Sequence, residues 1–402
     1  MTKPELLAPA GTLEKLKWSV AYGADAVYFG TEFGSLRSFA GNFTLEEAAQ
    51  GLNYLHAHGR KGYVTLNIYP FSEEYDQVTA TARALDEMGT DALIVSDLGV
   101  LTTLARMKLK AQLHISTQAN TVSAQSAQAH AMLGATRVNL ARELSLAQIE
   151  TIQTQVRGVI DTEVFVHGAL CFAYSGRCAI SDYLTGFRAN HGECKHPCRW
   201  KYTLMEEKRP GQYFPVFEDD RGLYLFHSKD LALYEFLPAL ARAGVGSFKI
   251  EGRMKSIHYI ASTVAFYRHV INGRIFSHEE ASALLGRIRN RGYSTGFMKG
   301  TITADDYSFE RGGSQGTATF VGNVCECDTE KGSCIVEVRN KMQPGDALEV
   351  LTPDGNLSTL ILPNPLINQQ GEVIDIANNS QFVRLDTPLP EYTILRQIMK
   401  GQ

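Results

Sequence analysis

Four cysteines are concentrated in one short stretch near the middle of the chain. They are Cys171, Cys178, Cys194 and Cys198, and six, fifteen and three residues separate successive members. Four thiolates can hold a zinc ion or an iron–sulfur cluster. Structural zinc sites usually take a closely spaced pair from each half of the site, and only the last two cysteines are spaced in that way. The spacing favours a cluster and leaves zinc open as the alternative.

The composition does not point to a membrane or to an exported protein. The chain has 402 residues, of which 44% are hydrophobic and 20% charged, and its net charge is -4, so a polyanion must be met by a local basic patch. The N-terminal segment lacks the basic and apolar regions of a secretory signal, and no apolar run reaches the roughly 18 residues that span a bilayer. We therefore expect a cytoplasmic protein with reduced thiols and no membrane contact.

Short apolar runs alternate with amphipathic stretches through the first 170 residues, and Gly23, Gly89 and Gly134 each close one of these stretches. Strict alternation predicts a parallel sheet with right-handed crossovers. Seven strand–helix units precede residue 170 and an eighth strand follows later, which suits a closed (β/α)8 TIM-like barrel. The predicted strands are Glu5–Ala8, Ala26–Phe29, Tyr63–Ile68, Ala92–Val95, Leu113–Ile115, Arg137–Leu140, Glu163–Val166 and Ser247–Ile250. The predicted helices are Leu13–Tyr22, Leu45–His58, Glu73–Met88, Leu98–Met107, Ser123–Leu133 and Ser145–Val156.

The pattern changes near residue 307, where a glycine-rich joint leads into short strands separated by turns. We predict a barrel domain over 1–306 and a C-terminal all-β, barrel-like domain over 307–402. A cysteine-bearing insertion of about 169–223 follows the seventh barrel strand, and 224–226 is either a further strand or part of that insertion. The predicted C-terminal strands are Ala318–Asn323, Cys334–Val338, Ala347–Leu351, Ser358–Leu362, Glu372–Ile376 and Phe382–Leu385. Cys325 and Cys327 alternate along this sequence, so we interpret them as packing residues on one side of a strand.

Active sites of β/α barrels lie at the C-terminal ends of the strands, where Cys171 is expected. Lys249, Glu251, Arg253 and Lys255 come at the end of the eighth strand. The two lysines and the arginine are suited to binding a dicarboxylate or phosphates. The alternative interpretation is a solvated loop with a local Lys–Glu pair.

Other candidates occupy the same end of the predicted barrel. Arg37 and Asn42 lie in the loop after the second strand and are candidates for substrate binding. His114 and His167 end strands five and seven. A histidine at such a position either has a role in substrate binding or catalysis, or is a hydrogen-bonded packing residue. Gln118 and Asn120 follow strand five, and Asn139 and Arg142 end strand six. These four positions are suited to reading a base edge or to making turns.

Several stretches of the chain resemble the U32 family, which was first described as peptidases or collagenases. The longest is EVFVHGALCFAYSGRCAIS, from Glu163 to Ser181, and others are ELLAPAG near the start, RSFAGNFT from Arg37, CRW from Cys198 and KIEGRMKS from Lys249. The resemblance covers about residues 4–300, and the strand-rich tail is similar to the C-terminal domain that many members carry.

The resemblance implies a barrel that binds a [4Fe-4S] cluster through Cys171, Cys178, Cys194 and Cys198 and hydroxylates its substrate without dioxygen. Chain length favours the branch that acts on tRNA, at carbon 5 of the wobble uridine, with prephenate as the hydroxyl donor. We take His167 and Glu251 as catalytic candidates, and Arg37, Asn42, His114, Lys249, Arg253 and Lys255 as substrate-binding candidates. The expected partners are tRNA, prephenate and a second protein of the same family.

Three other functions stay open. One is hydroxylation of ribosomal RNA or of a quinone precursor, and another is a non-catalytic role as a cluster-bearing partner protein. The peptidase function has no support from sequence motifs, since the chain contains neither a nucleophile elbow nor an HExxH zinc motif.

Overall fold

The computed structural model describes residues 3–35, 42–170, 228–300 and 315–399, together with residue 306 and short pieces between 184 and 224. The chain divides into two compact units. The first comprises residues 1–20, 24–255 and 291–314, and the second comprises 21–23, 256–290 and 315–402. Arg37 and the four clustered cysteines lie outside the described residues. No helix in the described ranges is long and apolar enough to cross a bilayer.

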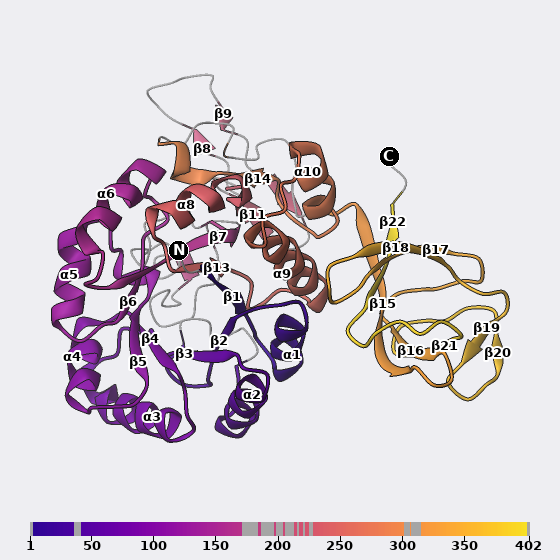
Figure 1. The fold of residues 1–402 in the computed structure, drawn as a ribbon, viewed down its shortest axis with the longest axis horizontal. Coiled ribbons are helices and arrows are strands. Elements are labelled where there is room, and N and C mark those ends of the chain that lie inside the picture. Colours follow the sequence, from indigo (N-terminus) through magenta and orange to yellow (C-terminus); the bar gives the residue numbers. More distant parts are fainter. Residues whose placement is uncertain are drawn as a thin grey trace. The chain divides into compact units, whose positions relative to one another are not determined.

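Eight parallel strands of the first unit close into a barrel (Figure 1). Each of the first seven pairs with the next along the chain, and the last, β13, pairs in parallel with both β1 and β7. This closure confirms the predicted TIM-like barrel. The strands are β1 (Glu5–Pro9), β2 (Ala26–Gly30), β3 (Lys61–Thr65), β4 (Ala92–Val95), β5 (Gln112–Ile115), β6 (Arg137–Asn139), β7 (Asp161–Ala169) and β13 (Ser247–Ile250).

Several helices between these strands begin at side-chain caps, and several are followed by glycines. Thr44 and Ser145 form capping boxes at the starts of two helices, and Asp97 caps a third. Gly89 and Gly134 follow two helix ends with φ of 86° and 103°, a conformation that favours glycine. The helices of this unit are α1 (Leu13–Ala21), α2 (Leu45–Ala57), α3 (Tyr75–Glu87), α4 (Leu98–Arg106), α5 (Ala124–Met132), α6 (Leu146–Val156) and α8 (Leu237–Ala243).

Strand β7 continues past the barrel and pairs with a strand from beyond the cysteine-bearing segment. Its residues His167–Ala169 run antiparallel to β12 (Asp230–Ala232), and Asp230 lies opposite Ala169. The chain therefore leaves the barrel after Ala169 and returns at the same place. Two short hairpins in between, β8–β9 (Leu204–Met205, Tyr213–Phe214) and β10–β11 (Phe217–Asp219, Gly222–Tyr224), are separate from the barrel sheet. Tyr224 thus belongs to the insertion and not to a further barrel strand.

The second unit contains one eight-stranded antiparallel sheet. Its core is aliphatic and includes Val321, Val336, Leu348 and Leu395. A register shift between Val324 and Glu326 interrupts the alternation that we used to place Cys325 and Cys327 on one side of a strand. The strands are β15 (Ala318–Asp328), β16 (Ser333–Val338), β17 (Ala347–Leu351), β18 (Leu357–Ile361), β19 (Leu366–Asn368), β20 (Val373–Ile374), β21 (Phe382–Leu385) and β22 (Ile394–Ile398).

Two helices, α9 (Ile257–Ile271) and α10 (His278–Gly286), belong to the second unit, and a buried ion network joins them to the strands. Arg396 on β22 is 2% exposed and lies 2.6 Å from a carboxylate oxygen of Glu349 on β17. Arg287, just after α10, makes a two-pronged contact with the same carboxylate, with both N–O distances 2.6 Å. Arg396 also donates to Ser262 of α9 at 3.0 Å. These pairings offset the cost of burying the arginine.

Candidate active site at the C-terminal end of the barrel

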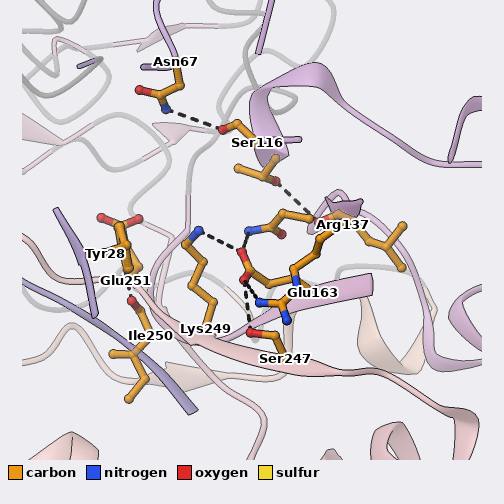
Figure 2. Close-up of polar contacts among 12 residues, drawn as sticks. Tyr28, Asn67, Ser116, Arg137, Glu163, Ser247, Lys249, Ile250 and Glu251 are labelled. Carbon is orange, nitrogen blue, oxygen red and sulfur yellow. Dashed lines mark hydrogen bonds and ion pairs between the residues drawn. The ribbon is translucent and has the colours of Figure 1, made fainter. Parts of the chain in front are cut away.

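A buried polar network fills the barrel below its C-terminal end (Figure 2). Lys249 Nζ lies 2.8 Å from Glu163 Oε1, and the two side chains are only 5% and 4% exposed. Asn139 Nδ2 donates to the same oxygen at 2.9 Å, and Ser247 Oγ donates to Glu163 Oε2 at 3.1 Å. The Lys249 ammonium also lies over the Tyr28 ring, 4.4 Å from its centre. Lys249 is therefore held inside the barrel by Glu163, and the predicted substrate-binding cation is part of a buried pair.

A second set of charges closes the N-terminal end of the barrel. Arg137 lies 2.6 Å from Glu5 and 2.8 Å from Asp161, and Tyr63 donates to Glu5 at 2.7 Å. His114 packs edge-on against Tyr63, with ring centres 4.8 Å apart. Burial, followed by the positive charges of Arg137 and Lys249, holds the pKa of His114 well below its ordinary value. His114 is thus a neutral, buried residue of the barrel interior.

Arg253 lies at the C-terminal end of the barrel, where the sequence predicts it. Its side chain is 4% exposed, and its NH1 group donates to Ser35 Oγ at 2.8 Å and to Thr65 Oγ1 at 3.3 Å. A Cβ atom at Gly30 would overlap both this NH1 group and the Ser35 hydroxyl. The close approach of the guanidinium to β2 therefore requires glycine at position 30.

Glu251 and Arg142 form an ion pair at the same end of the barrel. Arg142 NH2 is 3.5 Å from Glu251 Oε2, and the side chains are 13% and 15% exposed. The guanidinium stacks over Phe165 at 4.0 Å and donates to the carbonyl oxygen of Ala169 at 3.1 Å. Arg142 thus links the catalytic candidate Glu251 to the end of β7, two residues before Cys171.

His167 lies in a buried cluster of charged residues around the β7–β12 pairing. Its ring is 5.4 Å from that of Tyr293, and Asp230 forms an ion pair with Arg291 at 2.5 Å. Burial, together with the positive charge of Lys255 and against the opposing effect of Asp230, lowers the pKa of His167 to about 3. A ring with this pKa is neutral at pH 7 and binds a proton weakly, so it is suited to orienting a neighbour as a neutral hydrogen-bonding group.

The pKa of Asp230 shows the balance of charge in this cluster. Burial opposes ionisation of Asp230, but Arg291 and Lys255 outweigh it and hold the pKa below its ordinary value. Asp230 and Arg291 were absent from our sequence predictions. The lysine at 255 was predicted, and the structure brings it close enough to His167 to affect its titration.

The remaining candidates have different positions. Asn42 immediately precedes Phe43, which bridges Thr31 beyond the end of β2, so it lies at the C-terminal end of the barrel. Arg37, Cys171, Cys178, Cys194 and Cys198 fall outside the described residues, and the described residues contain no group of three or more histidines, cysteines or carboxylates arranged to hold a metal ion. The cysteine segment begins next to Leu170, directly after β7, so its attachment point is at the predicted end of the barrel.

Comparison with known proteins gives the family of the chain. Residues 11–307 match the profile of "Peptidase family U32", and residues 317–396 match the "Peptidase family U32 C-terminal domain". The "tRNA hydroxylation protein P" of Escherichia coli (strain K12) is 36% identical over 453 aligned positions, covering 100% of this chain and 98% of that protein. The "tRNA hydroxylation protein P1" of Bacillus subtilis (strain 168) is 38% identical, covering 88% and 84%.

A third relative carries a different substrate in its name. The "23S rRNA 5-hydroxycytidine C2501 synthase" of Escherichia coli (strain K12) is 37% identical over 277 positions, covering 67% of this chain and 40% of that protein. The chain matches both family profiles in order, and it is more than 30% identical to a relative along its whole length. This chain is a member of peptidase family U32.

Proposed function

We propose that this protein hydroxylates carbon 5 of the wobble uridine of tRNA, without dioxygen and with prephenate as the hydroxyl donor. The observation that carries the proposal is the 36% identity to a tRNA hydroxylation protein along the whole chain. The barrel supports it, because the buried arginine, histidine and carboxylates described above gather at the end where β/α barrels carry their active sites.

A [4Fe-4S] cluster on Cys171, Cys178, Cys194 and Cys198 belongs to the proposal. The donor set fits, since the four thiols lie in one segment and both ends of that segment meet at the paired residues Ala169 and Asp230. When bound, such a cluster supplies a Lewis-acidic or redox-active iron centre at this end of the barrel.

The described residues suit an anionic donor with two carboxylates. Arg253 is oriented by hydroxyl groups of Ser35 and Thr65, and its planar guanidinium matches the geometry of a carboxylate. Lys255 adds a second positive charge near His167. Glu251, held by Arg142, would orient the substrate or accept a proton at its carboxylate.

The sequence pattern alone favours a tail that helps to grip RNA, but the charge of the tail favours the barrel domain for that role. Residues 317–396, the C-terminal family domain, contain 11 acidic and five basic residues. Lys and Arg supply most of the attraction to phosphates, so this net negative charge favours the barrel domain for binding the RNA backbone.

Nucleoside mass spectrometry of tRNA from a strain lacking this gene tests the proposal. We expect 5-hydroxyuridine derivatives to be lost, and to return when the gene is supplied on a plasmid. Unchanged levels in the deletion strain would exclude the tRNA function. Loss of a ribosomal-RNA mark, or of quinone during anaerobic growth, would assign the other hydroxylations. Cleavage of gelatin by the purified protein, at a rate that added tRNA does not reduce, would support a peptidase function.

A further inference from the structure

One glutamine at the C-terminal end of the barrel has its side-chain amide fixed in orientation by three neighbouring strands. The oxygen Oε1 of Gln118 accepts hydrogen bonds from Asn67 Nδ2 at 2.7 Å, Ser116 Oγ at 2.9 Å and Ser96 Oγ at 3.3 Å. These three donors follow β3, β5 and β4, and each is at most 7% exposed. Figure 2 shows Asn67 and Ser116 directed toward one another at this place.

The backbone of Gln118 is fixed as well. Ser116 caps the single turn Thr117–Ala119 by accepting from the Gln118 N–H, and Tyr69 donates to the Gln118 carbonyl oxygen at 2.7 Å. Asn120 ends the turn in the left-handed region, with φ of 52°. The residue therefore has little freedom to turn its amide in another direction.

The amide nitrogen of Gln118, Nε2, has no acceptor in the described part of the chain and can donate to a ligand. An amide nitrogen carries two N–H groups, and Nε2 of Gln118 donates to no group among the described residues. The side chain is half-buried. A preorganised donor at the reacting end of a barrel is an arrangement for recognising a hydrogen-bond acceptor on the substrate.

We infer that Gln118 is a specificity-determining residue that donates to the C4 carbonyl oxygen of the target uracil. The inference rests on the proposed function, because carbon 5 reacts and the C4 oxygen is attached to the neighbouring ring atom. The C2 oxygen lies on the other side of the ring. Cytosine carries an amino group at C4, which is itself a donor and would face the Nε2 donors of Gln118. The residue therefore selects uridine over cytidine.

Gln118→Glu separates this role from a structural one. The glutamate keeps an oxygen for Asn67, Ser96 and Ser116, and it replaces the N–H donors with an acceptor. In the deletion strain carrying the variant, we expect hydroxylated uridine in tRNA to fall about 10- to 100-fold. For a tRNA with cytidine at position 34, we expect the ratio of hydroxylated cytidine to hydroxylated uridine to rise about 10-fold, because a carboxylate accepts from the cytosine amino group. Gln77→Glu, at an exposed position of α3, is the matched control and should change neither quantity.

A second measurement covers the case in which Gln118→Glu fails to fold. Binding of the wild-type protein to anticodon stem-loops should weaken when 4-thiouridine replaces uridine at position 34, since sulfur is a poorer acceptor, and should not weaken with 2-thiouridine. Equal binding of the two thiouridines, or a Gln118→Glu variant with wild-type preference and activity, would overturn the inference while the proposed function stands. If the wild-type gene restores no hydroxyuridine, both fall together.

Discussion

Lys249 on β13 and Glu163 on β7 form an ion pair across adjacent barrel strands, with 2.8 Å between nitrogen and oxygen and almost no solvent exposure. Taking two charges out of water is costly, so each member depends on the other. Ser247 and Asn139 complete the hydrogen bonds of the carboxylate. The pair therefore contributes to the stability of the barrel as well as to the charge of its interior.

Removing only the lysine should strongly destabilise the barrel. We expect Lys249→Met to lower the free energy of unfolding by up to about 3–5 kcal/mol, because the buried Glu163 carboxylate loses its nearest cation and keeps only Arg137, at 3.8 Å. The double variant Lys249→Met/Glu163→Gln should recover most of this loss. Urea unfolding followed by circular dichroism measures both, and Lys110→Met, at an exposed position, should stay within about 0.5 kcal/mol of wild type. If Lys249→Met were as stable as the wild type, Glu163 would not depend on the lysine for its burial.

Replacing one cysteine of the proposed cluster should release iron. We expect Cys171→Ser, purified without oxygen, to contain much less iron and sulfide than the wild-type protein, because serine is a poor ligand for iron–sulfur clusters. Cys327→Ser is the matched control, since Cys327 is a half-buried free cysteine on β15. Equal iron contents in the two variants would contradict the ligand assignment, and zinc in place of iron would establish the alternative metal.

A methyl group at position 30 should disturb Arg253. The added Cβ of Gly30→Ala would overlap the guanidinium and the Ser35 hydroxyl, so the arginine must move. A displacement of about 1 Å at a substrate-binding group can lower activity on the order of 100-fold. Hydroxyuridine formation in the complemented deletion strain measures the effect, and Gly286→Ala is the control because its Cβ would meet only ordinary contacts at 3.9 Å. Normal activity of Gly30→Ala would remove Arg253 from the proposed site.

His258 in the second unit should make stability depend on pH. Burial and the nearby charge of Arg396 lower its pKa to about 3, whereas the unfolded histidine titrates near 6.5. Between these values the unfolded state binds more protons than the folded state, so stability is complete above pH 6.5 and falls as the pH drops toward 3.

The expected slope from His258 is at most about 1.4 kcal/mol per pH unit. His258→Gln should reduce the slope over this window, because the amide does not titrate and can still accept from Arg396. Urea unfolding at pH 4, 5, 6 and 7 provides the comparison. His278→Gln, at an exposed position at the start of α10, should leave the slope unchanged. A slope equal to wild type in His258→Gln would contradict the assignment.

Much of the barrel follows from local sequence signals. The bounds predicted for Ala92–Val95 and Ser247–Ile250 agree with the structure, because short apolar runs between polar residues and glycines delimit buried parallel strands. Strand β7 extends beyond its predicted end at Val166, because residues 167–169 pair with β12, more than 60 positions later in the chain. Such pairing leaves no local signal.

The C-terminal sheet contains two strands that we did not predict. Strand β22 lies between β15 and β17, yet its buried Arg396 interrupts the apolar pattern that identifies a central strand. The arginine is tolerated there because Glu349 and Ser262 accept its hydrogen bonds, and neither partner is near in sequence. The other missed strand, β19, has only three residues.

The sequence indicated where several candidate site residues lie, and the roles given to them stay predictions. Strand ends gave the places of Arg253 and Lys255, since parallel strands all finish at one edge. The sequence could not show that Lys249 turns inward to Glu163, or that Asn67, Ser96 and Ser116 converge on Gln118, because these partners come from different strands. Alternation along β13 does place Ser247 and Lys249 on one face, and that signal identifies the interior side of the strand.

Ala169 and Asp230 are neighbours across a sheet although about 60 residues of chain separate them. A loop whose two stems are already joined adds little further entropic cost when it grows or shrinks, and the change does not alter the register of the eight barrel strands. The barrel strands can therefore keep their register when residues are added to or removed from the segment between Ala169 and Asp230.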